Sequence, residues 1–220
     1  MYKKLKKKFK AVIFDMDGVI TNTMPYHFDA WLEIFSSAGV KVNCFDVYER
    51  EGQPGLITIR EIFKRENKGI SLKEARLLLA KKEKLFKRIV KIKFVKGAQA
   101  FIKNLKKHKF QLGLVTGTSR HEVEKILPTA LLKIFNVIVT GDQVKKGKPD
   151  PEPFLEALSQ LALNPGAVMV IENAPFGILS AKRAGLYCIA LETSLPKKYL
   201  RQANRIFKSF KELEKNFFNF

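Results

Sequence analysis

The sequence predicts an α/β protein with a doubly wound, mostly parallel sheet, a Rossmann-like core and a small inserted α-helical cap. Three observations support this prediction. After residue 94, short apolar runs alternate with helical patterns, as in parallel strands joined by helices. A mostly helical stretch separates the first apolar run from the later ones. The chain has 220 residues, 46% of them hydrophobic, which is enough for a sizeable core.

The first part of the chain combines one strand with several helices. Residues 11–15 read as a short buried strand. Over residues 26–38 the apolar positions recur at helical spacing. Residues 46–93 are also mostly helical in pattern, and Ser71 followed by Glu74 is a capping box. We therefore expect a helical module directly after the first strand.

The second part alternates helices with strands. Helices are expected over 98–108, 119–127, 151–162 and 175–184, and the strands after them lie in "FQLGLVTGT", "NVIVTGD", "AVMVIEN" and "YCIAL". Connections of this kind are right-handed and place helices on both faces of the sheet. The predicted domains are an α/β core of residues 1–23 and 94–220 and a helical cap of residues 24–93.

Polar residues stand at the ends of the predicted strands. They are Asp15, Thr116, Gly141-Asp142 and Glu172-Asn173. In parallel sheets, ligands bind outside the carboxyl ends of the strands. We therefore expect these residues to converge on one edge of the sheet and to form the functional site there.

The motif "FDMDGV" carries two carboxylates, Asp15 and Asp17. By itself this spacing is compatible with a helix cap and a solvated acid. At the mouth of a sheet, however, Asp15 is placed to act as a nucleophile that forms an acyl-phosphate. Asp17 is then suited to protonate a leaving group and afterwards to deprotonate water.

A carboxylate that attacks a phosphate dianion needs cations beside it. One candidate is Mg²⁺, which binds carboxylates and phosphate oxygens. The other is Lys148 in "KKGKPDPEPF", although the alternative for any lysine in a loop is simple solvation. Glu172 and Asn173 end a buried strand, where they are suited either to metal binding or to helix capping.

The segment after the second strand is a candidate phosphate cradle. Thr116 is followed by Gly117 and Thr118 at a predicted helix start, where a hydroxyl and free N–H groups can hold an anion. The alternative is an ordinary strand-to-helix turn with an N-cap. The residue types alone leave both interpretations open.

The formal net charge of +20 has three possible origins: attraction of nucleic acid, steering of an anionic substrate, or a lysine-rich proteome. The lysines are spread along the chain and no aromatic ladder is interleaved with them. We therefore expect no nucleic-acid partner. Steering and proteome bias are the favoured explanations.

No apolar run reaches the roughly 18 residues of a membrane span, and "AVIF" meets Asp15 before a signal-peptide core can form. We expect a cytoplasmic protein with no membrane partner. Cys44 and Cys188 are expected to be two buried thiols in a reducing compartment.

Four segments occur in a family's order: "FDMDGVITNT", "LGLVTGTSR", "KGKPDPEPF" and "VIENAPFGILSAKRAG". With them the chain resembles the haloacid dehalogenase-like superfamily, in the branch of β-phosphoglucomutase and related phosphatases with a helical cap after the first motif. The resemblance covers nearly the whole chain. It implies Mg²⁺ as cofactor, Asp15 as the nucleophile that becomes aspartyl-phosphate, and Asp17 as the general acid and base whose carbonyl also binds Mg²⁺.

The resemblance implies further roles in holding phosphate and metal. Thr116 would hold the phosphoryl group with the backbone of Gly117 and Thr118, Lys148 would neutralise charge, and Asp15, Asp17, Glu172 and Asn173 would be the metal set. In the predicted cap, His27 and Trp31 match a pattern of sugar-phosphate members, with helix packing as the alternative for both. Gly52 lies in a glycine-rich turn suited to face the site.

Two departures from the family's pattern bear on function. Asn173 stands where an aspartate is common, which predicts weaker binding of Mg²⁺. The arginine that phosphomutases of this branch place just after the glycine turn is missing, and Arg60 lies further along in a predicted helix. A mutase must hold a bisphosphate at both ends, so the loss of one anchor favours transfer of phosphate to water.

The sequence thus predicts a monomeric, Mg²⁺-dependent phosphatase for a small phosphomonoester, with a sugar phosphate as the favoured substrate. A β-phosphoglucomutase-like phosphomutase is the main alternative. A non-catalytic nucleic-acid-binding protein is a weaker one, because the nucleophile, acid/base, threonine and lysine positions are all intact.

Overall fold

The computed structural model describes residues 9–218, so the first eight residues of the basic N-terminal run lie outside the described part. It contains a six-stranded parallel sheet with the order β3-β2-β1-β4-β5-β6. The strands are β1 Ala11–Phe14, β2 Gln111–Val115, β3 Val137–Val139, β4 Val168–Glu172, β5 Tyr187–Leu191 and β6 Arg205–Phe207. The predicted α/β fold with a doubly wound sheet is confirmed.

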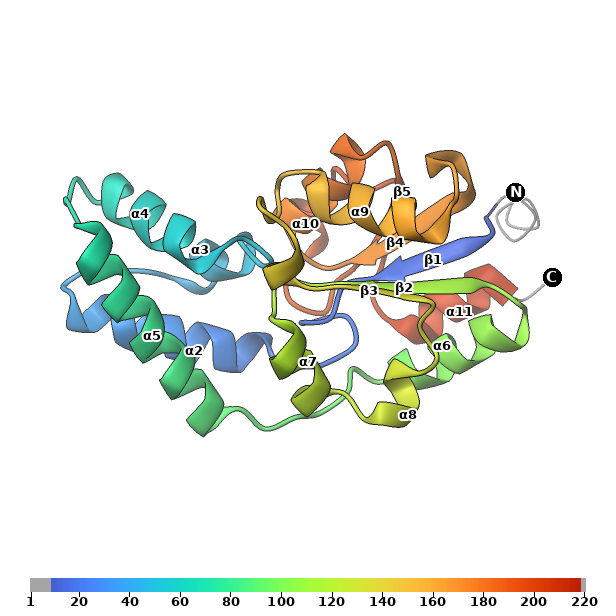
Figure 1. The fold of residues 1–220 in the computed structure, drawn as a ribbon, viewed down its shortest axis with the longest axis horizontal. Coiled ribbons are helices and arrows are strands. Elements are labelled where there is room, and N and C mark those ends of the chain that lie inside the picture. The colour runs from blue at the N-terminus through green and yellow to red at the C-terminus, as the bar shows by residue number, and fades with distance from the viewer. Residues whose placement is uncertain (1–8, 219–220) are drawn as a thin grey trace.

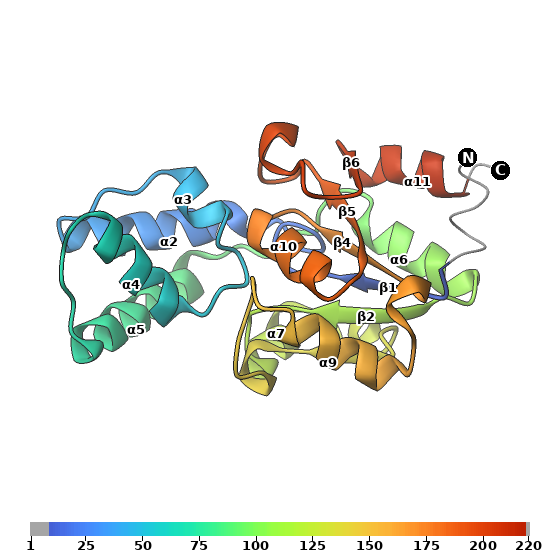
Figure 2. The ribbon, with the colours of Figure 1, turned by 90° about the horizontal axis from the view of Figure 1, so that it is seen from above.

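Helices cover both faces of this sheet (Figures 1 and 2). They are α6 Ala98–Lys107, α7 Arg120–Ile126, α8 Thr129–Leu132, α9 Glu152–Leu161, α10 Pro175–Arg183 and α11 Phe210–Phe218. Short 3₁₀ turns occur at Gly141–Gln143, Pro165–Ala167 and Lys197–Tyr199.

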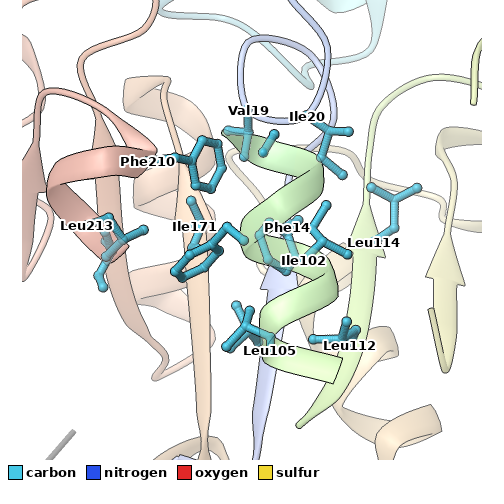
Figure 3. Packing of buried hydrophobic residues seen from close by; sticks show 14 of the residues in the cluster. Phe14, Val19, Ile20, Ile102, Leu105, Leu112, Leu114, Ile171, Phe210 and Leu213 are labelled. Atoms are coloured by element: carbon cyan, nitrogen blue, oxygen red, sulfur yellow. The ribbon is translucent and has the colours of Figure 1, made fainter. Parts of the chain in front are cut away.

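Alternation along each strand divides the core into two apolar layers. In β1, Val12 and Phe14 belong to the layer beneath α6, α7 and α11, whereas Ala11 and Ile13 belong to the layer beneath α9 and α10. Figure 3 shows part of the first layer, in which Phe14 packs beneath α6 between the side chains of neighbouring strands. With both faces covered, β1 is apolar at every position, and β2 and β4 carry a polar side chain only at one end, in Gln111 and Glu172.

The inserted segment forms four helices beyond the carboxyl ends of the strands (Figure 1). They are α2 Met24–Ser37, α3 Cys44–Tyr48, α4 Gly55–Arg65 and α5 Leu72–Ile89. We call residues 24–93 the helical module. It has its own apolar cluster, in which Trp31, Phe35 and Ile62 are buried. The mostly helical pattern expected over 46–93 is confirmed by α3, α4 and α5, which are separated at 49–54 and 66–71, and the capping box of Ser71 and Glu74 is confirmed.

Two adjacent crossings connect the helical module to the sheet. The amide of Asn22 donates to the carbonyl of Lys93 at 2.7 Å, and the amide of Val95 donates to the carbonyl of Ile20 at 2.9 Å. Thr21 and Phe94 form an antiparallel bridge between them. The crossings are therefore hydrogen-bonded side by side. The division of the chain into two domains at these points stays a prediction.

Two further features of the fold concern the thiols and the helix lengths. Cys188 is buried in β5, but Cys44 is exposed at the first turn of α3, so the expectation of two buried thiols is wrong for Cys44. Within residues 9–218, no helix combines the length and the apolar character that crossing a bilayer needs.

Candidate active site

The strand ends bring the predicted core residues together. Asp15 directly follows β1, and Glu172 ends the neighbouring strand β4. Lys148 reaches both of them: its Nζ lies 2.6 Å from Asp15 Oδ1 and 2.6 Å from Glu172 Oε1. All three side chains are buried, at 1% exposure each. Lys148 is therefore an ion-paired residue of the site and not a solvated loop lysine.

Burial and the neighbouring charges shift the pKa values of Lys148 and Asp15 in opposite directions. Burial lowers the pKa of Lys148, but Asp15 and Glu172 raise it by more, so the amine stays protonated. Burial raises the pKa of Asp15, and Lys148 offsets this only in part because Glu172 is also negative. A further positive charge at Asp15 would therefore stabilise its ionised form.

Two buried oxygen atoms beside the triad accept no hydrogen bond from any described residue: Asp15 Oδ2 and Asn173 Oδ1. Asn173 is fixed by its Nδ2, which donates to Ser194 Oγ at 2.7 Å. Its amide lies against Gly18, whose φ is +86° and where a Cβ would overlap the Asn173 side chain. One carboxylate oxygen and one amide oxygen without donors suit a hard cation such as Mg²⁺.

Glu172 uses its second oxygen differently. Glu172 Oε2 accepts hydrogen bonds from the backbone amides of Asn173 at 2.9 Å and Ala174 at 3.3 Å. Its two oxygens thus fix the start of the segment after β4 and orient Lys148. A carboxylate oxygen has more than one lone pair, so these bonds are compatible with the predicted metal role.

Asp17 lies among different partners. Its Oδ1 accepts a hydrogen bond from Thr23 and lies 3.4 Å from His27 Nε2, and its Oδ2 accepts from Thr118 Oγ1 at 3.3 Å. Burial would raise the pKa of Asp17, but the hydrogen bonds of His27, Thr23 and Thr118 together lower it. The two carboxylates of the first motif thus have separate environments, as two different chemical roles require.

The residues of the predicted phosphate cradle lie together after β2, with one contact that was not expected. Thr116 is buried, and its hydroxyl accepts a hydrogen bond from the amide of Thr118 at 3.1 Å. The resemblance implied a backbone role for Thr118, whereas the structure also places the Thr118 hydroxyl on Asp17. Gly117 is exposed and lines the cleft described below.

The loop 49–54 of the helical module is seated on the sheet edge. Gly52 has φ +81°, and a Cβ there would overlap the side chain of Lys148. A Cβ on Gly117 would lie 2.9 Å from Gly52 Cα, and the amide of Phe176 donates to the carbonyl of Glu49 at 3.0 Å. Gly52 therefore does face the site, and only a glycine permits this close approach.

His27 and Trp31 have both polar and packing contacts. His27 stacks on Phe86 with the ring centroids 4.0 Å apart, and its Nδ1 lies 3.1 Å from Lys82 Nζ. Trp31 stacks on Phe35 in the cluster of the module, and Lys82 Nζ lies 5.0 Å from its ring centroid. His27 thus connects Lys82 to Asp17, and the ring of Trp31 packs beside the Lys82 amine.

Sequence reasoning missed three residues of the site: Thr23, Glu51 and Lys82. Single atoms of Asp17, His27 and Glu51 that are able to bind a metal lie within 4.8 Å of one another, a spacing that would also accommodate an ion. A signal for Lys82 was present, since it follows Ala75 and Leu79 and precedes Phe86 at helical spacing. It is a lysine on the apolar stripe of α5.

A cleft of about 470 Å³ separates the helical module from the sheet edge. His27, Trp31, Glu51, Gly52 and Lys82 line it from the module, and Gly117 and Thr118 line it from the core. This volume is within the range of roughly 300–1,000 Å³ of small-molecule sites. Arg60 is exposed on α4 and does not line the cleft.

Comparisons with known proteins agree with this site. The family model "Haloacid dehalogenase-like hydrolase" matches residues 12–191. The chain is 31% identical over 206 residues to validoxylamine A 7′-phosphate phosphatase of Streptomyces hygroscopicus, covering 93% of this chain and 96% of that protein. It is 35% identical over 184 residues to a phosphorylated carbohydrates phosphatase of Thermotoga maritima, covering 80% and 82%.

A solved structure from Bacteroides vulgatus, provisionally named a β-phosphoglucomutase, superposes with a TM-score of 0.85 at 31% identity, covering 98% of this chain and 91% of that one. These matches confirm the resemblance drawn from the motifs and the prediction of a phosphatase of this superfamily. The chain therefore belongs to the haloacid dehalogenase-like hydrolase family, in the branch of β-phosphoglucomutase-like phosphatases and phosphomutases.

Proposed function

We propose that the protein hydrolyses a small phosphomonoester, with a sugar phosphate as the favoured substrate, through an aspartyl-phosphate on Asp15. The observation that carries the proposal is the pairing of Lys148 with Asp15 Oδ1, which leaves the buried Oδ2 without a donor. An oxygen in this situation is available to an electrophilic phosphorus. Relatives named as phosphatases of validoxylamine A 7′-phosphate and of phosphorylated carbohydrates support the substrate class.

The chain's own residues account for each step. Asp15 attacks phosphorus in line while Lys148 balances the charge, and Thr116 with the backbone of Gly117 binds the transferring group. Asp17 protonates the leaving alcohol and then deprotonates the water that hydrolyses the aspartyl-phosphate. His27, Thr23 and Thr118 hold Asp17 in place through their hydrogen bonds.

Mg²⁺ is the proposed cofactor. Asn173 Oδ1 would hold it together with the Asp15 carboxylate, whose Oδ1 keeps a lone pair beside its bond to Lys148, with Glu172 and the backbone carbonyl of Asp17 as the remaining predicted donors. When bound, the ion supplies positive charge next to a nucleophile whose pKa burial raises. The helical module, residues 24–93, would serve as a cap that excludes water from the cleft.

Hydrolysis is favoured over mutase activity because the arginine expected of a phosphomutase after the glycine turn is missing. A phosphomutase has to hold a second phosphate, for which an arginine at that position would supply a bidentate partner. Gly55 is the glycine that follows the turn at Gly52. A Cβ at this position would overlap the side chain of Leu79. Arg60 is exposed and outside the cleft. A mutase would convert hexose 1-phosphate to hexose 6-phosphate without releasing phosphate.

The test is to trap the intermediate. Wild-type protein is mixed with a phosphomonoester and Mg²⁺, quenched, and reduced with borohydride, which converts an aspartyl-phosphate to homoserine. We expect homoserine at position 15 by mass spectrometry and loss of phosphate release in Asp15→Asn. The matched control is Asp29→Asn, because Asp29 is exposed on α2 and does not line the cleft. Full activity of Asp15→Asn would refute the proposal.

A further inference from the structure

Glu51 is a carboxylate at the cleft that the proposed chemistry does not use. It lies in the loop 49–54, next to Gly52, which the contacts with Gly117 and Lys148 fix against the core. One of its oxygens lies within 4.8 Å of the site atoms of Asp17 and His27. Its side chain therefore faces the position that the leaving group would occupy beside Asp17.

No hydrogen bond or ion pair is formed by Glu51 with the other described residues, in contrast to the acids around it. Glu51 is half-buried, and this partial burial raises the pKa of its carboxyl, which gains no hydrogen-bonded partner in return. An acceptor that is partly withdrawn from water gains free energy when a ligand donates a hydrogen bond to it. Glu51 thus has free acceptor capacity next to the reacting centre.

The lysines and arginines of the same cleft each contact another side chain of the protein. Arg50 pairs with Glu49, Lys87 Nζ lies 2.7 Å from Glu122, and Lys82 Nζ lies 3.1 Å from His27. Within the described residues, these three are the cleft's lysines and arginines apart from Lys148 below it. Of these three, Arg50 and Lys87 have carboxylate partners, whereas the Lys82 amine contacts the ring of His27. A second anionic group on a substrate would meet the free carboxylate of Glu51 at this position.

We propose that Glu51 selects the leaving group: its carboxylate accepts hydrogen bonds from the hydroxyl groups of a neutral polyol and repels a second phosphate on the substrate. This inference rests on the proposed function. It narrows the substrate class to monophosphates of neutral, hydroxyl-rich compounds that fit a cleft of about 470 Å³. Rejection by an unpaired like charge is a common source of specificity.

The experiment compares kcat/KM for a hexose 6-phosphate with kcat/KM for the matching hexose 1,6-bisphosphate. For the wild type we expect a preference for the monophosphate of at least about thirtyfold, since like-charge contacts are strongly unfavourable in a desolvated cleft. In Glu51→Gln, which keeps the shape and removes the charge, the preference should fall at least about tenfold. The ratio of the two constants cancels any general loss of activity.

Glu83→Gln is the matched control, because Glu83 lines the same cleft but is exposed on α5. Its ratio should stay within about twofold of wild type, since an exposed charge is screened. An unchanged ratio in Glu51→Gln, an equal change in Glu83→Gln, or no preference in the wild type would overturn the inference.

p-Nitrophenyl phosphate separates this inference from the proposed function. Hydrolysis of this ester without hydrolysis of either hexose phosphate would refute the polyol leaving group and leave the aspartyl-phosphate chemistry standing. Failure to hydrolyse any of the three esters, together with no homoserine at position 15, would refute the proposed function itself.

Discussion

Two lysines are buried in the described part of the chain, one in the core beneath the cleft and one in the helical module that lines it. Lys148 belongs to the core, where Asp15 and Glu172 contact its amine at 2.6 Å. Lys82 belongs to the helical module, and its amine contacts His27 Nδ1 at 3.1 Å. One lysine thus has two carboxylates as hydrogen-bonded partners and the other has none.

The pKa values of the two amines shift in opposite directions. Asp15 and Glu172 raise the pKa of Lys148 against the effect of burial. Burial lowers the pKa of Lys82, because Glu51 and Asp17 oppose it only in part. The rings of Trp31 and Phe86 lie 5.0 Å from the Lys82 amine and add a weaker attraction.

The core side and the module side of the site therefore have different roles. The core side has a fixed positive charge that the sheet edge holds in place for phosphoryl transfer. The module side has a polar network of Lys82, His27 and Asp17, in which the amine has no carboxylate within hydrogen-bond distance. Substitutions on the core side should therefore affect every substrate, and those on the module side should depend on the leaving group.

The largest effect is expected for Lys148→Met. Without the amine, Asp15 and Glu172 repel each other and the transferred phosphoryl group loses its positive partner. We expect kcat/KM to fall about 10³-fold on all phosphomonoesters, the order seen when an electrostatic stabiliser is removed. Steady-state kinetics on an alkyl and an aryl phosphate test this, and a loss confined to one of them would contradict the comparison.

The same variant should unfold more easily, by about 3 to 5 kcal/mol, because two buried carboxylates lose their partner. The pKa of Lys148 is raised in the folded state, so its stabilisation is fully present below the unfolded pKa of about 10.4 and is lost as pH rises through the folded value. Urea unfolding of wild type and variant between pH 7 and 11 should show a constant difference that shrinks only at the alkaline end.

The next largest effect is expected where the two sides meet. Gly52→Ala introduces a Cβ at φ +81° against the Lys148 side chain. The loop must then shift away from the site, and displacement by about 1 Å costs on the order of 10²-fold in kcat/KM. Gly69→Ala is the control, because a Cβ there has no atom within 4 Å. Equal losses in both variants would show that the contact with Lys148 is unimportant.

A smaller and selective effect is expected for Lys82→Met. Without the amine, His27 loses its contact at Nδ1, and the position of Asp17 is then less well fixed. This should slow catalysis when the leaving group has to be protonated by Asp17. We expect kcat to fall about tenfold on an alkyl phosphate but less than about threefold on p-nitrophenyl phosphate. Lys81→Met, an exposed neighbour on α5, should leave both values unchanged. Equal losses on both esters would remove the proposed connection to Asp17.

Lys82→Met should also differ from Lys148→Met in stability. The pKa of Lys82 is lowered in the folded state, so its charged form disfavours folding below that pKa, and this penalty disappears above about 10.4. At pH 7 the free energy of unfolding should therefore stay within about 1 kcal/mol of wild type or rise. Urea unfolding measures this, and a drop as large as that of Lys148→Met would contradict the contrast between the two lysines.

The smallest effect is expected for Asn173→Asp, which acts on the core side alone. A second charged donor beside Asp15 Oδ2 should lower the Mg²⁺ concentration for half-maximal activity by about tenfold or less. Titration of activity with Mg²⁺ in wild type and variant measures the shift. No shift, or a shift to higher concentrations, would mean that Asn173 is not a donor to the ion.

The core side was predictable from the sequence because its geometry follows from topology. Parallel strands present their carboxyl ends at one edge, so Asp15, Thr116 and Glu172 had to meet there. Lys148 could be chosen among many lysines because of the prolines and acids of "KPDPEPF". The final strand β6 and helix α11 were not predicted. For β6 the reason is its length, since a run of three residues gives little signal.

The module side was not predictable in the same way. The position of Lys82 depends on how α5 packs against α2, and that of Glu51 depends on how the loop 49–54 lies on the core. Neither follows from a strand end. Periodicity marks Lys82 as part of a buried stripe, but only its contact with His27 distinguishes it from the other lysines of α5.

The paired crossings at Ile20–Asn22 and Lys93–Val95 have a consequence for timing. A group of helices that is attached at two neighbouring points can rotate about one hinge axis. Such a turn would carry His27 away from Asp17 and remove one of the hydrogen bonds that lower the pKa of Asp17. The position of the helical module would thus set how firmly Asp17 holds a proton.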